Sequence, residues 1–565
     1  MPQQPTSALS TFTITVNNQP LPDTFQIYSI LIEQATYAIP SASITIFNGN
    51  AGTGQIDDTV LDLLTPGNAI SISVGYNANN TLAFNGVITE QTFNSDEQYG
   101  AVLTISANDL ALQTAYQQKA VLHQTTNLSV LFKTIINNYA KLQAVVEDNS
   151  LLAYQQIQNQ QSDWDFLCQL AKKNGYLVNV LNGTIGITTL KAPAPKLILN
   201  YGDALLAVNL TTNAANQIAV VKAAAWDWQT KTHKEVTTTN TYVGPGSYSA
   251  TTLANALENA TYETSALTSC TEIELQQQNL ATLTFHNLSK TVGTIKTVGN
   301  LLANTGDHLT IYGCGSQFNG DYYVSGVKQL LQDGNWITTY QLGLALDKSK
   351  TANQAASFNQ SMFGVYTGVV MTNDNTTNGF IKVALPSLVN GDKGLLVAAI
   401  GSTTPTAQAG DEVVIGFTAA NADFPVLLST TRTANATAPL VSTTASPHET
   451  NATPLSTSAA DSVIQFATPQ GRTIELNDTT GSISFQDAEN SIVLNAQGIS
   501  IKSNGAITIS AAQGANVSSS GGDLQLSGIN IKATANVQLN LEATATATLN
   551  GGGETTIKGA MVLIN

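Results

Sequence analysis

The last hundred residues of this chain carry a repeat that restricts the fold more than any other feature. After Pro469 there is no further Pro, His, Cys, Trp or Tyr, and apolar residues recur in pairs at i and i+2. Gly, Asn, Asp, Ser and Thr separate the pairs. Each pair predicts a short strand that shows two side chains to one interior. The pairs are Ile474/Leu476, Ile483/Phe485, Ile492/Leu494, Ile499/Ile501, Ile507/Ile509, Leu524/Leu526, Ile529/Ile531, Val537/Leu539 and Ala547/Leu549, followed by Ile557 and Val562/Ile564.

Strands this short are marginal alone, and repeats of this kind gain stability by stacking. A single chain has trouble closing a core with such small repeats, whereas three chains would place one residue each at every level of a narrow axis. We therefore favour an intertwined trimeric prism over a single-chain β-helix. The regular apolar pairs argue against a disordered tail, because disorder goes with low hydrophobicity. The predicted needle core is Ile474, Leu476, Ile483, Phe485, Ile492, Leu494, Ile499, Ile501, Ile507, Ile509, Leu524, Leu526, Ile529 and Ile531.

The rest of the chain also reads as mainly β, with two clear helices. One apolar stripe from Leu128 to Tyr139 predicts a helix with Thr126 or Asn127 as its cap. A second helix is predicted to start at Ser162 and to end at Gly175. Between 363 and 431, five short strand candidates with turn signals predict a small barrel of the OB type.

Composition excludes several kinds of partner. The 565 residues suggest three or four domains. With 22 Lys and Arg against 38 Asp and Glu, the net charge is −16, which disfavours nucleic acid and anionic lipid as partners. We see no signal peptide and no apolar run long enough for a membrane helix, so we expect synthesis in the cytoplasm and no stable membrane insertion.

The sequence contains no recognisable catalytic or metal-binding motif. Its three cysteines are far apart, none of its five histidines pairs with another at metal-ligand spacing, and no HExxH, GxSxG or P-loop is present. We therefore predict no catalytic residue, no metal site, no cofactor and no enzymatic activity. Scattered carboxylates leave one alternative open, which is a glycan-cleaving or glycan-binding tailspike with a C-terminal β-helix. A passenger-type adhesin is disfavoured because no signal peptide is seen.

Three separated motifs resemble those of VgrG proteins and phage baseplate hub and spike proteins. The segment from Gln158 to Val180 is similar to the family's hub signature, and GDEVVIGF from Gly410 is similar to its OB-fold signature. The segments Ile474–Leu494 and Thr555–Asn565 resemble its β-helix and apex. The hub motif residues are Ser162, Asp163, Asp165, Phe166, Leu167 and Gly175, and the OB motif residues are Gly410, Asp411, Glu412, Val413, Phe417 and Pro425.

The resemblance implies a mainly β chain with six parts. Two β-barrel-like hub domains with inserted helices would precede a small OB-fold barrel and a trimeric β-helix needle. The expected parts are a first hub domain at 1–120, a helix-containing α+β segment at 121–200, a second hub domain at 201–360, the OB fold at 361–436, a linker at 437–465 and the spike at 466–565. No muramidase fits in a linker so short.

The resemblance also implies a mechanical function in a contractile injection system. Two related hub domains in each of three chains would give six similar units, which can dock a hexameric inner tube above a threefold needle. Sheath contraction would drive the needle through a target membrane. The other partners implied are baseplate proteins, effector cargo and a PAAR-type tip protein. A type VI secretion system, a released phage-tail-like particle and a phage baseplate all stay open as the host machine.

The end of the chain is the expected site for that tip protein. In a trimer, three copies of its apolar run would form a flat hydrophobic platform, and exposed patches of this kind mark interaction sites. The alternative is ordinary packing of the last strand. Since this apex has no His, we predict no metal there. The predicted tip-binding residues are Gly559, Ala560, Met561, Val562, Leu563, Ile564 and Asn565.

Overall fold

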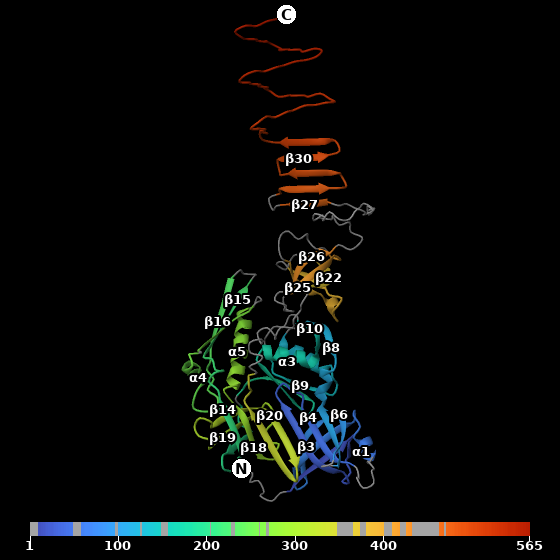
Figure 1. Cartoon of the computed structure of the whole chain (residues 1–565), viewed down its shortest axis with the longest axis vertical. Helices are drawn as coiled ribbons and strands as arrows, with labels where there is room; N and C mark the ends of the chain where they lie inside the picture. Colours follow the sequence, from blue (N-terminus) through green and yellow to red (C-terminus); the bar gives the residue numbers. More distant parts are fainter. Residues whose placement is uncertain are drawn as a thin grey trace. The chain divides into compact units, whose positions relative to one another are not determined.

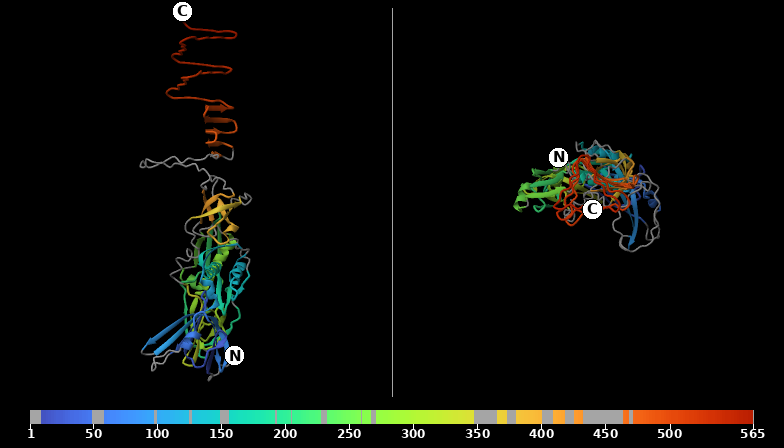
Figure 2. Two further views of the ribbon diagram at one scale, coloured as in Figure 1. Left: turned by 90° about the vertical axis from the view of Figure 1, so that its right-hand side faces the viewer. Right: turned by 90° about the horizontal axis from the view of Figure 1, so that it is seen from above.

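The structure is a computed structural model that is mainly β, as the sequence predicts. It forms two compact units, Met1–Ala436 and Thr437–Asn565, each of which is described by itself (Figure 1, Figure 2). The predicted linker lies outside the described residues as far as position 462. The structure describes residues 9–48, 58–96, 100–124, 127–148, 156–191, 193–203, 205–227, 232–258, 260–266, 271–346, 365–372, 380–399, 409–417, 425–431, 463–467 and 471–564.

A large, mostly antiparallel sheet organises the first unit. Its order is β14-β18-β21-β20-β3-β4-β7-β6-β5-β1-β2, and β13 and β19 join it beside β20. Its strands are β1 (Ser10–Val16), β2 (Gln19–Pro20), β3 (Gln26–Ala35), β4 (Ser41–Phe47), β5 (Ala69–Tyr76), β6 (Asn79–Asp96), β7 (Gly100–Asp109), β13 (Leu197–Asn200), β14 (Leu205–Thr212), β18 (Thr291–Val298), β19 (His308–Tyr312), β20 (Gly320–Gln332) and β21 (Asn335–Leu342).

Alternation along the strands decides which face of this sheet is buried. In β4, Ala42, Ile44 and Ile46 are buried in the core, while the Ser and Thr residues between them lie on the opposite face and are only partly buried. This is the period-two pattern of an antiparallel strand with one face on a core. The sheet therefore has an apolar face and a face lined by small polar side chains.

The same four-stranded arrangement occurs twice in this sheet, side by side. The first repeat is β3-β4-β7-β6 and the second is β14-β18-β21-β20, both in spatial order. Numbered by position along the chain, the strands of each repeat stand in the order first, second, fourth, third. In Figure 1, β14 and β6 lie at opposite ends of the eight-strand run, and β20 meets β3 in the middle.

The irregularities of the two repeats coincide as well. The β3·β4 pair shifts register between Ile27 and Ser29, and β14·β18 shifts between Leu205 and Ala207. The β6·β7 pair shifts between Ile88 and Glu90, and β20·β21 shifts between Val324 and Gly326. Bulges are specific features rather than accidents of pairing. Their coincidence establishes residue-by-residue equivalence between the repeats.

A turn beside the second bulge repeats too. The amide of Gly67 donates to the carbonyl of Ile88 at 2.8 Å, and the Ile88 amide donates to Asn68 O at 2.9 Å. In the second repeat, Gly306 donates to Val324 O and the Val324 amide donates to Asp307 O, both at 2.9 Å. Ile88 and Val324 are therefore equivalent positions in backbone hydrogen bonding as well as in strand register.

The remaining elements of the hub region cover this sheet or extend from it. The helices are α1 (Asp58–Leu63), η1 (Leu110–Ala115), α2 (Leu128–Asn137), α3 (Asp163–Lys173), α4 (Ala250–Ala256) and α5 (Glu272–Leu288). None of the described helices is both long enough and apolar enough to cross a membrane. The other strands here are β8 (Gln118–His123), β9 (Gln143–Val146), β10 (Gln156–Ser162), β11 (Tyr176–Leu181), β12 (Thr184–Thr189), β15 (Val220–Asp227), β16 (Thr232–Thr239) and β17 (Thr261–Ala266).

Both predicted helices form where the sequence places them. Asn127 caps α2 by accepting a hydrogen bond from Val130 N at 2.9 Å, and Ser162 caps α3 by accepting one from Asp165 N at 3.0 Å. Gly175 follows the C-cap of α3 with φ of +73°, a conformation that favours glycine. Its Cα faces α5, where an added methyl group would lie 2.9 Å from the Cα of Ala281.

A closed five-stranded barrel completes the first unit, as predicted. Its strands are β22 (Val365–Thr372), β23 (Phe380–Ala384), β24 (Leu395–Ala399), β25 (Glu412–Phe417) and β26 (Pro425–Thr431), with η2 (Gly391–Lys393) between β23 and β24. The barrel closes in the order β22-β23-β24-β26-β25. Val383, Val397, Val413 and Ile415 are fully buried in its core.

The second unit begins as a ladder of antiparallel strands. These are β27 (Val463–Ala467), β28 (Thr473–Asn477), β29 (Ser482–Gln486), β30 (Asn490–Asn495) and β31 (Gly498–Ser503), each paired with the next along the chain. Beyond β31, the described residues continue in wide turns that Figure 1 shows in red, and no strand is assigned to them.

Replacing Gly175 by Ala should destabilise the first unit more than the same change at Gly202. Both residues have positive φ, so both variants carry a left-handed strain of about 1 kcal/mol. Only the methyl group at 175 meets backbone, that of α5, whereas none of the described atoms lies within 4 Å of one at 202. We expect G175A to cost about 1–3 kcal/mol beyond G202A in urea unfolding. Equal losses would show that the contact between α3 and α5 is looser than described.

Candidate assembly surfaces

The hub motif residues form the start of α3 and a buried junction around it. Ser162 Oγ donates to Asp165 Oδ2 at 2.6 Å while it accepts from the Asp165 amide, so the two residues fix the first helical turn. Phe166 and Leu167 are buried in the cluster between α2, α3 and β11. The motif therefore stabilises the start of α3, and its Asp163 side chain also forms hydrogen bonds with residues outside the motif.

Asp163 collects three donors in a buried position. Its Oδ2 accepts from Lys119 Nζ at 2.6 Å and from the Tyr139 hydroxyl at 2.7 Å, and its Oδ1 accepts from Gln158 Nε2 at 2.9 Å. Burial alone would raise the pKa of this carboxyl group, but the hydrogen bonds from Lys119, Gln158 and Tyr139 outweigh it and lower the pKa. His123 Nε2 extends the network by donating to Gln158 Oε1 at 3.0 Å.

These partners come from separate elements that the motif alone does not identify. Lys119 lies on β8, Gln158 on β10 and Tyr139 just after α2. A single Lys or Gln in a strand carries no pattern that marks it as the partner of a distant Asp. Sequence reasoning therefore found Asp163 and missed its partners.

The two-stranded sheet of β8 and β10, here called the bridge sheet, connects this junction to the barrel. His123 stacks on Phe166 of α3, with ring centroids 5.3 Å apart. Leu122 and Ile157 are buried in the barrel core. The Leu122 amide also donates to the carbonyl of Val389 in the barrel at 3.0 Å. One pair of strands thus belongs to both the hub junction and the barrel.

The OB motif residues build the closure of the barrel. Val413 and Phe417 lie on the core side of β25, and Pro425 opens β26 opposite Phe417. Gly410 has φ of +95°, and its amide donates to Val370 O on β22 at 2.8 Å. Glu412 pairs with Val369 on the same strand. Asp411 supplies the carbonyl that accepts from the Val370 amide at 2.9 Å.

The needle-core residues of β28 to β31 fall into register on one face of the ladder. Ile474 pairs with Phe485, which pairs with Ile492, which in turn pairs with Ile501. The second column runs through Leu476, Ile483, Leu494 and Ile499. Along β28, β29 and the start of β30 these side chains are between 39% and 45% exposed in a single chain. The ladder therefore presents an aligned apolar face, here called the ladder face, that its own chain leaves half uncovered.

The predicted strands beyond residue 503 are not formed in the single chain. The segments that hold Ile507, Ile509, Leu524, Leu526, Ile529 and Ile531 carry no strand assignment, and all six side chains are exposed. The same holds for the pairs Val537/Leu539 and Ala547/Leu549. The physical reason is that a strand exists only where a neighbour accepts and donates its backbone hydrogen bonds. Within the described residues, no strand pairs with this stretch.

The predicted tip-binding residues lie at the end of this stretch. Met561, Val562, Leu563 and Ile564 are exposed, and Gly559 and Ala560 precede them in a segment with no strand or helix assignment. Asn565 lies outside the described residues. The apolar run is thus accessible in one chain, and its arrangement in a trimer stays a prediction.

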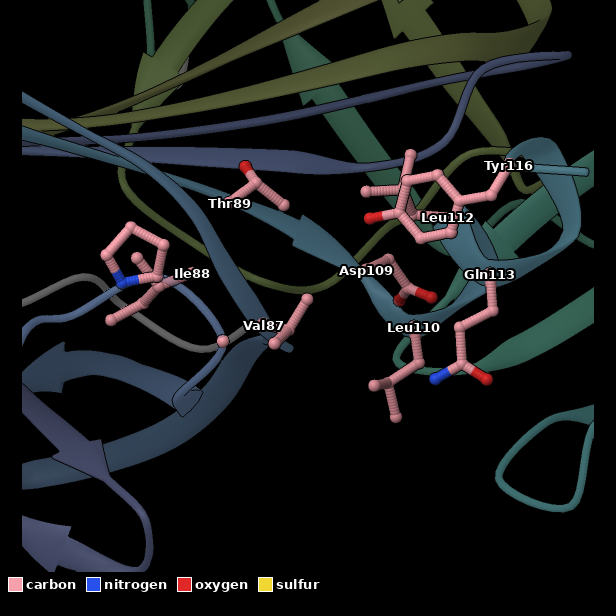
Figure 3. Close-up of a pocket in the computed structure, with 10 residues that line it drawn as sticks. Val87, Ile88, Thr89, Asp109, Leu110, Leu112, Gln113 and Tyr116 are labelled. Carbon is pink, nitrogen blue, oxygen red and sulfur yellow. The ribbon is translucent and has the colours of Figure 1, made fainter.

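One cavity of about 480 Å³ opens between β6 and η1 (Figure 3). Val87 and Ile88 line one side, and Leu112, Gln113 and Tyr116 line the other. Asp109 is its only carboxylic acid, and both oxygens accept backbone hydrogen bonds, from Ala111 N at 2.8 Å and Gly183 N at 2.9 Å. Burial raises the pKa of Asp109 despite these bonds. The cavity therefore lacks the pair of carboxylates that glycoside hydrolysis needs.

The described residues form no cluster of side chains that could bind a metal ion. Nowhere in the described ranges do three or more His, Cys, Asp or Glu side chains gather closely enough to hold a metal ion. Cys168 is buried, which raises the pKa of its thiol to about 12. The polar cluster around Asp163 is internally hydrogen-bonded through Lys119, Tyr139 and Gln158.

Replacing Asp163 by Asn should destabilise the hub, because Lys119 would lose its anionic partner. We expect a loss of about 2–3 kcal/mol at neutral pH in urea unfolding. The matched control is D148N, which removes the exposed ion pair with Lys133 and should cost less than about 0.5 kcal/mol.

The penalty of D163N should also depend on pH. The folded-state pKa of Asp163 is lowered, so its contribution is present at neutral pH and is lost as the pH falls below about 4. Melting curves of both variants at pH 7 and pH 3.5 check this. A penalty that stays constant over that range would contradict the assigned network.

Comparison with known proteins gives a family and a set of similar folds. No curated protein sequence matches the chain. Among solved structures, it is similar to the 43 kDa tail protein of prophage MuSo2 from Shewanella oneidensis, with 10% identity and a TM-score of 0.47 over 59% of this chain and 98% of that one. These values mark a similarity of fold alone.

Two further solved structures are similar. One is the E. coli c3393 protein, described as a component of the type VI secretion system with structural similarity to the T4 bacteriophage tail proteins gp27 and gp5. It has 13% identity and a TM-score of 0.48 over 74% of this chain and 99% of that one. The other is the Francisella PdpA-VgrG complex in its half-lidded form, with 11% identity and a TM-score of 0.49 over 88% of both chains.

The family comparison covers the hub. The family model described as the Alg8 N-terminal domain matches residues 6–333, which is more than half of the chain and includes the first repeat of the large sheet and all of the second except β21. On that match, the chain belongs to the Alg8 N-terminal domain family.

Proposed function

We propose that this chain is the structural hub and spike of a contractile injection system, either a type VI secretion system or a phage-tail-like particle, and that it works as a homotrimer. The observation that carries the proposal is the ladder face, whose aligned apolar side chains the single chain leaves half uncovered. The sequence motifs of hub, barrel and needle, which resemble those of VgrG and phage hub proteins, support the same assignment.

The ladder face calls for more copies of the same chain. Its large side chains are aligned in two columns, so a second and a third copy of the ladder can cover them symmetrically. Burying the remaining exposed area contributes on the order of 1 kcal/mol for each side chain. Beyond residue 503, neighbouring chains would supply the backbone partners that the single chain lacks. The needle is then a threefold prism.

The duplicated sheet supports the part of the proposal that concerns the hub and its docking to the inner tube. Two equivalent repeats in each of three chains give six similar units around one axis. A ring with this pseudo-sixfold symmetry can dock a hexameric inner tube, while the needle keeps its threefold symmetry. The role is mechanical, since it couples the tube to a piercing needle, and it calls for no catalytic residue, metal or cofactor.

The apex would carry a PAAR-type tip protein. Met561 to Ile564 form an exposed apolar run, and three copies would make a platform of the kind that marks an interaction site. Baseplate proteins and effector cargo are the further partners that this role calls for. The complex would be assembled in the cytoplasm and delivered outward when the sheath contracts.

The purified chain should be a trimer. From a chain mass of 59.3 kDa, light scattering should give about 178 kDa, and a monodisperse monomer would refute the proposal. Placing a charge on the ladder face, as in Ile483→Lys, should weaken the trimer and lower its melting temperature. The matched control is Ser484→Lys, which points to the opposite face of the same strand and should leave the trimer intact. Equal behaviour of the two variants would show that the ladder face is not the interface.

Deleting residues 559–565 should abolish binding of a PAAR-type tip protein and leave the trimer intact. The reason is that the deletion removes the exposed apolar run and leaves β27 to β31 untouched. Co-purification with the tip protein measures the first effect, and light scattering measures the second. Unchanged binding would show that the apex assignment is wrong. A second variant, with Met561, Val562, Leu563 and Ile564 all replaced by Ser, separates loss of apolar contact from loss of chain length.

A further inference from the structure

The bridge sheet contains a strained position next to the polar network of Asp163. The pairing of β8 with β10 shifts register between Gln158 and Gln161, so β10 carries a bulge there. Inside the bulge, Gln160 has φ of +46°, a left-handed conformation that residues other than glycine rarely adopt. Strained residues of this kind persist only where surrounding contacts hold them, and they cluster in segments that switch conformation.

One side chain holds the bulge closed. Gln158 is fully buried, and its Nε2 donates to the carbonyl of Gln161 across the bulge and to Asp163 Oδ1, both at 2.9 Å. Both amide hydrogens are thereby used, so Gln158 Oε1 accepts from His123 Nε2 at 3.0 Å. This contact assigns the proton of the neutral ring to Nε2 and leaves Nδ1 without one. The bulge, Asp163 and His123 are therefore all held by Gln158.

His123 lies half-buried between the hub junction and the barrel. Its ring stacks on Phe166 of α3, with centroids 5.3 Å and planes 17° apart. The residue before it, Leu122, belongs to the barrel core. The residue after it, Gln124, donates from Nε2 to the carbonyl of Gly394 in the barrel at 2.7 Å. A change of charge at His123 therefore acts on the strand that connects these two parts.

We propose that His123 makes this connection sensitive to acid. The neutral ring holds the bridge sheet closed at neutral pH. Protonation of its Nδ1 favours a local opening in which β8 and β10 separate and the bulge at Gln160 relaxes. The inference concerns contacts within one chain, so it goes beyond the proposed function and does not depend on the trimer.

The charged groups around the ring act in opposite directions. Asp163 of α3 attracts a positive charge on His123, whereas Lys119 on β8 repels it. Tyr139, which follows α2, donates to Asp163 and accepts from Lys119 Nζ at 3.4 Å, and it adds no charge in acid. β10 presents the uncharged Gln158 to the ring. The barrel meets β8 through backbone hydrogen bonds and apolar side chains.

The balance of these influences fixes the pH range of the opening. Burial lowers the pKa of His123, and the hydrogen bond to Gln158 and the attraction of Asp163 do not outweigh it. The closed sheet therefore binds the proton less readily than an open one, whose ring is in water with a pKa of about 6.5. The stability of the closed sheet is complete above about pH 6.5 and falls as the pH drops below that value. Asp163, whose pKa is lowered, stays charged until the pH approaches about 4.

Hydrogen exchange of the full-length protein at pH 7 and pH 5 tests the proposal. After correction for the intrinsic pH dependence of amide exchange, peptides that cover β8 and β10 should lose protection several-fold at pH 5. The ceiling is about thirtyfold, which applies if the closed ring binds no proton at all. Peptides from β4, which contains no histidine, should keep their protection. Unchanged protection of β8 and β10 would overturn the proposal.

A pair of matched variants assigns the effect to one ring. His123→Gln removes the titration and keeps a donor for Gln158 Oε1. It should retain the protection of β8 and β10 at pH 7 and abolish the loss at pH 5. The control, His233→Gln, changes an exposed histidine on β16 and should leave the loss in place. The same loss at pH 5 in H123Q as in the unmodified chain would show that His123 is not the sensor.

A direct titration of the ring decides the case in which H123Q does not close the bridge sheet even at pH 7. Deuterium exchange at the imidazole Cε1 position, followed by mass spectrometry across a pH series, gives the pKa of each histidine in the full-length chain. We expect a pKa below about 6.5 for His123, because the closed sheet disfavours its charged form. A pKa at or above that value would rule out the acid-sensitive connection.

Discussion

The demand of every strand for hydrogen-bonding neighbours governs how this chain can be built. In the first unit the demand is met almost entirely within the chain, by one large sheet and a closed barrel. In the second unit it is met only as far as β31, and the following described residues run on without a partner strand. The outer edges of β14 and of the part of β6 beyond Ile88 likewise have no strand partner within the described ranges. Under the proposed function, two further copies of the chain would supply these missing strand partners.

The sequence predicts those parts of the fold that depend on local pattern. The apolar stripe from Leu128 and the Ser162 cap identify α2 and α3, because periodicity and capping are properties of neighbouring residues. The pairs from Ile474 to Ile501 identify the ladder for the same reason. The duplication is different, since the residues Glu90 and Gly326, which follow the equivalent bulges, share no side-chain chemistry. It becomes visible only in strand order and bulges, which are set by pairing over long distances in the sequence.

The candidate site residues also separate into those that local sequence pattern predicts and those that it does not. The six hub motif residues are found from sequence because their spacing follows one helical turn and its ends. The partners of Asp163 are missed because Lys119, Gln158 and Tyr139 are brought to it by three different elements. The predicted strands beyond residue 503 fail in the single chain for the opposite reason. Their pattern is strand-like, but pattern alone supplies no partner for the backbone.

Under the proposed function, the bridge sheet would carry load between the hub motif and the barrel. A load that passes between the barrel and the hub can travel through β8 and β10, whose residues Leu122 and Ile157 are part of the barrel core. At the hub end, the same strands are held by Asp163 through Lys119 and Gln158. Buried charge-assisted hydrogen bonds are stronger than neutral ones and directional. They resist sliding of the strands along α3, which apolar packing alone would oppose less. Under the proposed function, the polar network would keep the connection between the junction around α3 and the barrel from slipping under load.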